Sequence, residues 1–201
     1  MIHDPDGPDI ATAPEAPQAS PWNVPNALTV LRMLMVPLFV WLLMRQSGED
    51  VSDRWWAALV FVVATATDWV DGHLARRNGM ITAFGKLMDP IADKALMGSA
   101  LVCLSLLGEL PWWVTVVILV REVGITLMRF VVIRRGVIPA SRGGKLKTAL
   151  QAVGLSLMLT PLDGVVGTAG LWIMYAALVV TVVTGVDYLR QAFGPRPTPA
   201  R

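Results

Sequence analysis

The sequence has few charged residues and a single cysteine. Only 16% of its 201 residues are Asp, Glu, Lys or Arg, whereas 54% are hydrophobic. A water-soluble domain of this length needs more polar side chains to cover its surface, so the composition argues against a soluble protein. The lone Cys103 excludes an intrachain disulfide, and because it lies in an apolar stretch we expect a packed core thiol.

The first 22 residues lack the basic segment and the apolar core of a secretory signal. They are rich in proline, alanine and acidic residues, so we expect residues 1–22 to be a disordered cytoplasmic arm. Prolines near the other end predict a flexible cytoplasmic tail over residues 191–201. Residues 23–190 remain as one transmembrane domain.

Apolar runs of about 20 residues, the length that crosses a bilayer, follow one another along that domain. They are residues 26–46, 55–77, 86–107, 111–133, 146–162 and 166–189. We therefore predict an all-α fold, a polytopic integral membrane bundle of six transmembrane helices.

Basic residues gather in alternate connections between these runs. The second and fourth connections and the C-terminal end are rich in Lys and Arg, whereas the first, third and fifth connections are poor in them. The positive-inside rule then places both termini in the cytoplasm. Tryptophans lie at the opposite, outer helix ends, as interfacial anchors do: Trp55, Trp56, Trp112, Trp113 and Trp172.

Four aspartates lie where the second run ends and the third begins. Asp68 and Asp71 are three residues apart, and Asp89 and Asp93 are four apart, so each pair shares one face of a helix. Four carboxylates in or near a bilayer need a counter-charge, and oxygen donors suit hard divalent cations. We expect two Mg²⁺ or Mn²⁺ ions in a polar cavity that opens to the cytosol.

Other interpretations of the aspartates stay open from the residues alone. The carboxylates could pair with Arg or Lys, or they could line the path of a divalent-cation transporter. Transport sites usually lie near the bilayer midplane, whereas these aspartates open to one face. Arg76 would also be out of place beside a cation path. His73 lies inside the motif, and we interpret it as a bystander.

The pattern Asp-x2-Asp-Gly-x2-Ala-Arg-x8-Gly-x3-Asp-x3-Asp begins at Asp68. It resembles the signature of the CDP-alcohol phosphatidyltransferases, usually homodimers that carry two metals. The resemblance implies that Asp68, Asp71 and Asp89 are metal ligands. Asp93 would be both a ligand and the base that takes the proton of the acceptor alcohol. A CDP-lipid pocket is also implied, lined by Pro25, Asn26, Gly72, Arg76, Thr82 and Gly85.

The donor in this family is a CDP-linked lipid, here CDP-diacylglycerol. No Ser, Cys or His placed to act as a nucleophile accompanies the aspartates, so we expect direct attack by the alcohol without a covalent intermediate. We expect no nucleic-acid partner.

The acceptor has to be inferred from other residues. Arg121 and Arg129 lie on one face of the fourth predicted helix, and Lys145 and Lys147 lie at the cytoplasmic end of the fifth. These cations suit a phosphate-bearing acceptor, and Arg32 could join them or contact the pyrophosphate. A plainer interpretation is that the lysines only mark the cytoplasmic side.

Three further segments indicate a branch of the family: Asn-Val-Pro-Asn-Ala-Leu-Thr-Val-Leu-Arg, Arg-Glu-Val-Gly-Ile-Thr-Leu-Met-Arg and Gly-Lys-Leu-Lys-Thr. They resemble the bacterial branch whose acceptor is sn-glycerol 3-phosphate and whose products are phosphatidylglycerophosphate and CMP. The resemblance implies the bacterial inner membrane as the location. The closest alternative within the family is a cardiolipin synthase, whose acceptor is phosphatidylglycerol. Inositol-phosphate and serine transferases share the signature but fit these later segments less well.

Overall fold

The computed structural model describes residues 24–78, 83–132, 142–162 and 164–193, with some side chains at helix ends left undescribed. These residues form helices and contain no strand. The helices are α1 (Val24–Met44), a short 3₁₀ turn η1 (Arg45–Gly48), α2 (Val51–Asn78), α3 (Ala83–Leu106), α4 (Trp112–Val132), α5 (Arg142–Leu159) and α6 (Val165–Phe193). The all-α prediction is confirmed, and each predicted apolar run coincides with one α-helix.

Two of the described helices are long and apolar enough by themselves to cross a membrane. They cover Asn26–Gly48 and Val165–Arg190, with mean hydropathies of 2.1 and 2.0. The other helices carry charged residues within their apolar stretches, among them Asp68, Asp93 and Arg121. Charged residues lower the mean hydropathy of the helix segment that contains them, so the count of six membrane spans stays a prediction.

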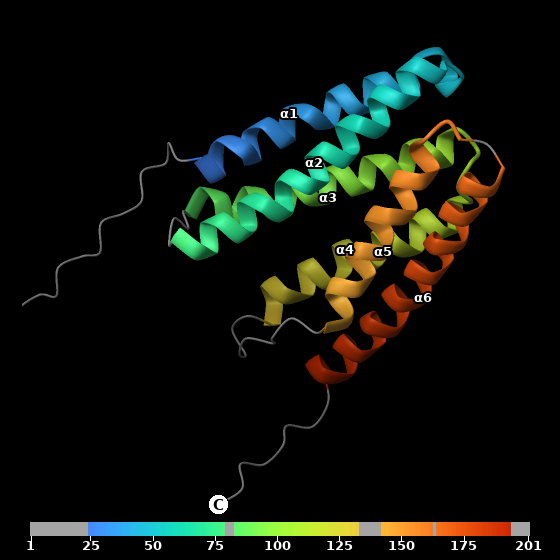
Figure 1. Ribbon diagram of the computed structural model, residues 1–201. Helices are drawn as coiled ribbons and strands as arrows, with labels where there is room; N and C mark the ends of the chain where they lie inside the picture. Colours follow the sequence, from blue (N-terminus) through green and yellow to red (C-terminus); the bar gives the residue numbers. More distant parts are fainter. Residues whose placement is uncertain (1–23, 79–82, 133–141, 163, 194–201) are drawn as a thin grey trace, which may run out of the picture.

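The helices form two groups (Figure 1). In the first group, α1 packs along both α2 and α3. In the second, α5 and α6 make the most extensive contact in the bundle, and α4 packs on α6. Contacts of α5 with α2 and α3, and of α3 with α4, join the groups. The groups diverge toward the end of the bundle where α1 begins and α6 ends (Figure 1).

Short turns reverse the chain at the other end. After α1, three successive residues have positive φ, Gln46, Ser47 and Gly48. The Asp50 carboxylate then caps α2 by accepting a 2.8 Å hydrogen bond from the Asp53 amide. Between α3 and α4, Gly108 has a φ of 78°, the left-handed conformation that commonly ends a helix.

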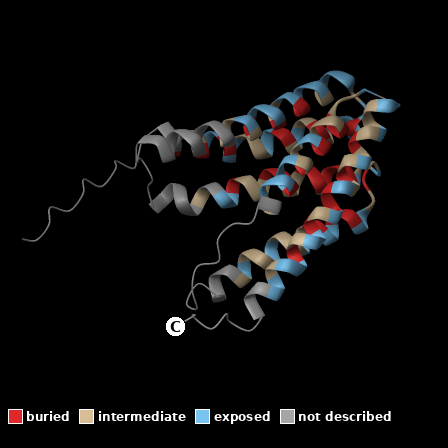
Figure 2. Cartoon of the chain, turned by 60° about the horizontal axis from the view of Figure 1, so that its bottom comes forward, coloured by how far each residue is buried: buried red, intermediate tan, exposed pale blue. Residues whose placement is uncertain are grey.

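Buried residues are most concentrated at the end with the short turns (Figure 2), and their polarity changes along the bundle. Near the short turns, the later half of α1, α3 and α5 and the earlier half of α2, α4 and α6 form an apolar core that includes Phe39, Phe61, Leu104 and Met174. Toward the other end the buried residues are largely polar: Asn26, Thr29, Arg32, Lys147, Gln151 and Thr181. The fold therefore has an apolar half and a polar half, and Asn26, Arg32 and Lys147 are predicted site residues that lie in the polar half.

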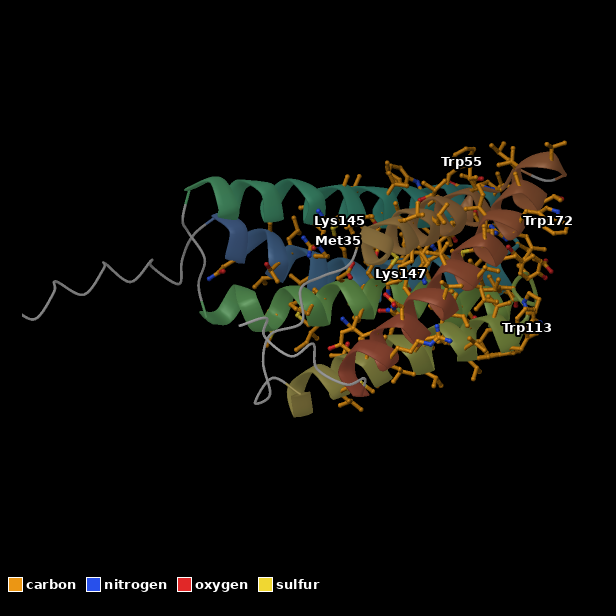
Figure 3. All side chains as sticks on the ribbon, turned by 90° about the horizontal axis from the view of Figure 1, so that it is seen from below. Met35, Trp55, Trp113, Lys145, Lys147 and Trp172 are labelled. Carbon is orange, nitrogen blue, oxygen red and sulfur yellow. The ribbon has the colours of Figure 1, made fainter. Side chains whose placement is uncertain are left out.

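Exposed tryptophans gather at the end of the bundle that holds the apolar half (Figure 3). Trp55, Trp113 and Trp172 gather at that end of the molecule (Figure 3) and are all exposed. Trp113 stacks on Tyr175 with ring centroids 6.0 Å apart, and Trp172 meets the edge of the same tyrosine. Aromatic side chains with exposed faces are typical of the lipid–water boundary.

At the same end, Arg54 of α2 cross-links three segments. Its guanidinium forms an ion pair with Glu109 of the α3–α4 turn, including an Nη2–Oε2 distance of 2.8 Å. It also donates a 3.0 Å hydrogen bond to the Met158 carbonyl, one of the last acceptors of α5. Arg54 and Glu109 line a pocket of about 430 Å³ beside the α5–α6 turn.

Two glycines allow α5 and α6 to approach closely. A Cβ atom at Gly170 would lie 3.0 Å from the Gly154 carbonyl oxygen, and one at Gly154 would lie 2.9 Å from Met174 Sδ. Small residues at facing positions are common where membrane helices pack tightly.

Candidate active site

The polar half holds two of the predicted metal ligands on adjacent helices, Asp68 on α2 and Asp93 on α3. Asp71 and Asp89 belong to the same two helices, but their side chains lie outside the described residues. Within the described residues no three His, Cys, Asp or Glu side chains group together as a metal site. The four-aspartate site is therefore untested and stays a prediction.

Asp68 forms an ion pair with Arg32 of α1. The Arg32 side chain is fully buried, whereas that of Asp68 is 39% exposed. A buried guanidinium requires a partner, because an unpaired charge in a low-dielectric interior is strongly destabilising. Arg32 therefore supplies one counter-charge to the aspartate region.

Asn26, Thr29 and Arg32 form a polar strip on the buried face of α1, since a spacing of three keeps side chains on one face. Asn26 is one of the residues predicted to line the CDP-lipid pocket. The side chains of the other five, Pro25, Gly72, Arg76, Thr82 and Gly85, lie outside the described residues.

Asp93 connects this region to α5. It is half-buried, and its carboxylate interacts electrostatically with Arg32, with the neighbouring Lys94 and with Lys147. Asp93, the predicted base, is therefore close enough to Lys147, a residue predicted to bind the acceptor, for their charges to interact.

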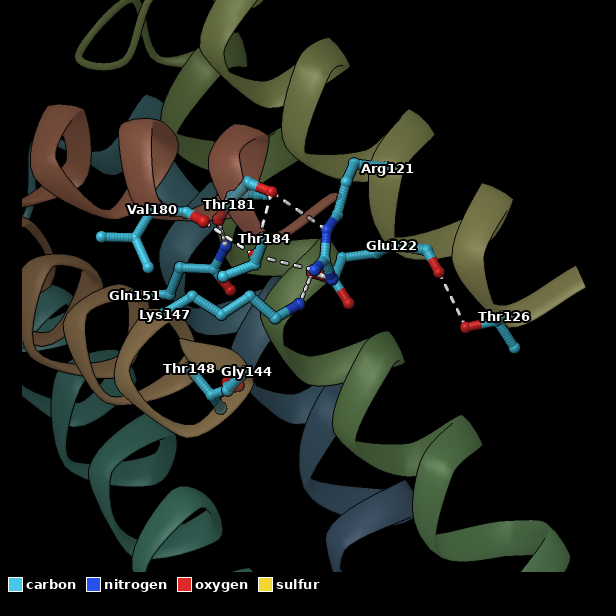
Figure 4. A network of polar contacts seen from close by, with 10 residues as sticks. All are labelled: Arg121, Glu122, Thr126, Gly144, Lys147, Thr148, Gln151, Val180, Thr181 and Thr184. Atoms are coloured by element: carbon cyan, nitrogen blue, oxygen red, sulfur yellow. Dashed lines mark hydrogen bonds and ion pairs between the residues drawn. The ribbon is translucent and has the colours of Figure 1, made fainter. Parts of the chain in front are cut away.

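A second polar cluster joins α4, α5 and α6 (Figure 4). Arg121 and Lys147 both contact the same carboxylate oxygen, Glu122 Oε1. Arg121 also donates hydrogen bonds from Nη2 to Thr184 Oγ1 at 2.9 Å and from Nε to the Thr181 carbonyl at 3.2 Å. The Gln151 amide reaches Thr181 Oγ1 at 3.3 Å. One carboxylate therefore bridges two cations from different helices.

The residues predicted to bind the acceptor do not all lie in one cluster. Arg121 and Lys147 are brought together, and Lys147 is buried. Lys145 lies on α5, the helix that also carries Lys147, but it is exposed. Residues two apart in an α-helix point to different faces of the helix. Arg32 pairs with Asp68. The side chain of Arg129 lies outside the described residues.

Thr29, Gln151, Thr181 and Thr184 are polar residues of this region that the sequence did not single out. Each lies in an apolar run, and Thr181 and Thr184 are three apart on one helix face. The sequence feature that could have pointed to them is the spacing of polar residues on one helix face within an apolar run. Gln151, Thr181 and Thr184 have partners on other helices, so only the packing reveals their role.

Comparison with known proteins decides the family. The family model described as CDP-alcohol phosphatidyltransferase matches residues 22–183. The chain belongs to this family. The match covers all six helices up to the later part of α6, so the CDP-alcohol phosphatidyltransferase domain accounts for nearly all of the described bundle.

Curated relatives of this CDP-alcohol phosphatidyltransferase carry more specific names. A probable phosphatidylglycerophosphate synthase of Mycobacterium tuberculosis (strain ATCC 25618 / H37Rv) is 54% identical over 170 residues, 85% of this chain and 81% of the relative. A CDP-diacylglycerol–glycerol-3-phosphate 3-phosphatidyltransferase of Bacillus subtilis (strain 168) is 34% identical over 180 residues, 83% of this chain and 93% of the relative. A protein of the same name from Rickettsia typhi (strain ATCC VR-144 / Wilmington) is 35% identical over 176 residues, which are 84% of this chain and 96% of the relative.

Membership has two consequences for the site. CDP-alcohol phosphatidyltransferases are membrane-embedded enzymes and generally depend on divalent metal ions. The described residues fit such an ion in their chemistry: Asp68 and Asp93 offer carboxylate oxygens from adjacent helices, and both remain partly exposed although one already pairs with Arg32.

Proposed function

We propose that this chain transfers the phosphatidyl group of CDP-diacylglycerol to sn-glycerol 3-phosphate and releases CMP. The observation that carries the proposal is the pair of cations, Arg121 and Lys147, which the Glu122 carboxylate bridges. Lys147 also interacts electrostatically with Asp93. A phosphomonoester carries about two negative charges, so such a pair suits it better than it suits a neutral alcohol. The names of the relatives support the same acceptor.

In this proposal the four aspartates, Asp68, Asp71, Asp89 and Asp93, hold two Mg²⁺ or Mn²⁺ ions. The bound ions would neutralise the pyrophosphate and make its phosphorus more electrophilic. The Asp93 carboxylate accepts the proton of the attacking hydroxyl as the new oxygen–phosphorus bond forms and the bond to CMP breaks. Direct attack needs no nucleophilic side chain of the protein.

The donor and the acceptor would occupy different parts of the polar half. We assign the CDP group to the α1–α2–α3 side, with Pro25, Asn26, Gly72, Arg76, Thr82 and Gly85. The acceptor phosphate is assigned to the α4–α5–α6 side, with Arg121, Arg129, Lys145 and Lys147. Arg32 lies between them in this scheme, since it pairs with Asp68 and acts on Asp93.

The same proposal covers the setting of the enzyme. We infer that it spans the bacterial inner membrane six times as a homodimer, with both termini and the active site on the cytoplasmic side. The Lys and Arg residues of the second and fourth connections support this orientation, and the exposed tryptophans (Figure 3) are consistent with a membrane boundary at the other end.

An acceptor screen tests the proposed reaction. Purified protein would be incubated with CDP-diacylglycerol, Mg²⁺ and one candidate acceptor at a time: glycerol 3-phosphate, phosphatidylglycerol, inositol phosphate or serine. We expect CMP release with glycerol 3-phosphate, and a product with the mass of phosphatidylglycerophosphate. The Asp93→Asn protein is the matched control, expected to show an unchanged helical circular dichroism spectrum and no turnover.

Two outcomes would contradict the proposal. Product formation with phosphatidylglycerol alone would identify a cardiolipin synthase. No CMP with any acceptor, together with Mg²⁺ flux into proteoliposomes in the absence of nucleotide, would favour a cation transporter.

A further inference from the structure

Arg121 is held largely by a helix that contributes no residue to the predicted site. Its Nε donates to the Thr181 carbonyl at 3.2 Å and its Nη2 donates to Thr184 Oγ1 at 2.9 Å, so the Nε–Nη2 edge of the guanidinium faces α6. Only Nη1 faces Glu122 on its own helix, at 3.2 Å. The direction of a planar guanidinium is determined by such contacts, so α6 determines where Arg121 points.

The Thr184 hydroxyl is itself oriented. It approaches the Val180 carbonyl oxygen at 2.7 Å, closer than its 3.2 Å approach to the Thr181 carbonyl. A hydroxyl has one proton to donate, and donation to Val180 leaves its lone pairs directed at Arg121. Thr184 therefore acts as a fixed acceptor toward the guanidinium.

Gly185 makes room for the arginine stem. A Cβ atom at this position would lie 3.3 Å from Arg121 Cγ and 3.4 Å from its Nε. The first separation is tighter than most Cβ contacts and the second is at their lower limit, so a Cβ atom would require the arginine stem to shift by a few tenths of an ångström. Glycine here is explained by the close approach of Arg121.

The segment is also fixed in space. Thr181 is fully buried and its hydroxyl is contacted by Gln151 of α5. Earlier in α6, Gly170 packs against the α5 backbone near Gly154. Because α5 and α6 form the most extensive helix contact, α6 offers a rigid support.

We propose that Thr181, Thr184 and Gly185 form a seat on α6 that positions Arg121 to bind the phosphate of the acceptor. The inference rests on the acceptor role of Arg121 in the proposed function. Thr184 and Gly185 are positioning residues: they act through Arg121 and do not touch the substrate. A merely structural role, in which Arg121 only ties α4 to α6, would alter stability without selecting between the two substrates.

Steady-state kinetics with each substrate varied separately tests the seat. Thr184→Val keeps the shape and removes the acceptor, and we expect it to raise the KM for glycerol 3-phosphate about tenfold, the effect of losing one hydrogen bond to a charged group. The KM for CDP-diacylglycerol should stay unchanged. Thr184→Ser, which keeps the hydroxyl, should restore the lower KM.

Matched controls separate the seat from general effects of substitution. Ser156→Ala removes a hydroxyl that bonds only to the Ala152 carbonyl of its own helix, and it should change neither KM. Gly185→Ala should raise the KM for glycerol 3-phosphate. Gly124→Ala, where a Cβ meets nothing within 4 Å, should not.

A double-mutant cycle decides the mechanism. Arg121→Ala should raise the KM for glycerol 3-phosphate, and adding Thr184→Val to it should cause no further rise, because Thr184 acts only through Arg121. A full additional rise would overturn the seat. If Arg121→Ala leaves this KM unchanged, the acceptor role in the proposed function fails. If Arg121→Ala raises it and Thr184→Val does not, only the seat fails.

Discussion

Replacing Gly170 with alanine tests how the two most closely packed helices are held together. A Cβ atom there would lie 2.7 Å from Met158 Cγ, 3.0 Å from the Gly154 carbonyl oxygen and 3.1 Å from Leu157 Cβ. The Met158 side chain can rotate away. The other two atoms are fixed by the α5 backbone, so α5 and α6 have to move apart.

The expected size of the effect combines two opposing terms. Forcing a methyl group into a close-packed contact destabilises a protein by about 1–3 kcal/mol. Alanine has a better helix propensity than glycine, which offsets up to about 1 kcal/mol. We therefore expect Gly170→Ala to lower the free energy of unfolding by about 1–2 kcal/mol.

Equilibrium unfolding in mixed micelles, with increasing SDS and helicity followed by circular dichroism, measures this change. Gly154→Ala is a graded comparison. The three atoms nearest to its Cβ would belong to the side chains of Met174 and Ile173, which can move, so we expect a smaller loss. Gly124→Ala meets nothing within 4 Å and should be neutral or stabilising.

The test is the order of the three variants in free energy of unfolding. If Gly170→Ala is as stable as the parent protein, or more stable than Gly154→Ala, the close approach of α5 and α6 is not a source of stability. The reasoning from the Gly154 carbonyl would then be wrong.

Two further predictions concern the ends of the bundle. Arg54→Met should lower the free energy of unfolding by about 1–3 kcal/mol, because Glu109 and the Met158 carbonyl lose a shared donor. The same SDS titration measures this loss. An unchanged midpoint would show that the cross-link contributes nothing to stability. Removing divalent metal with EDTA should abolish CMP release and leave the helical circular dichroism spectrum unchanged, with activity regained on adding Mg²⁺. Loss of helicity on chelation would contradict this expectation, since Arg32 already balances Asp68.

Hydropathy and charge spacing predicted the helices well. Each apolar run found in the sequence coincides with a helix, because burial in a bilayer requires both continuous apolar residues and satisfied backbone hydrogen bonds. The predicted fifth run began at residue 146, whereas α5 begins at Arg142. Hydropathy misses such a polar first turn. The family prediction is confirmed by the match over residues 22–183.

Pairing between helices could not be read from the sequence in the same way. The sequence placed Lys145 and Lys147 together, but helix geometry buries one and exposes the other. It left the partner of Arg32 open, and the packing of α1 on α2 pairs this residue with Asp68. Thr184 and Arg121 are 63 residues apart, so their hydrogen bond depends on how α4 docks on α6.

The pair formed by Arg32 and Asp68 bears on the order of events when the protein is made. The helix carrying Arg32 is synthesised first, and the helix carrying Asp68 follows directly after it. A lone carboxylate is costly to insert into lipid, but here a cation is already in the membrane when the first aspartate arrives. The charge of Asp68 can therefore be balanced within the membrane before any metal is supplied.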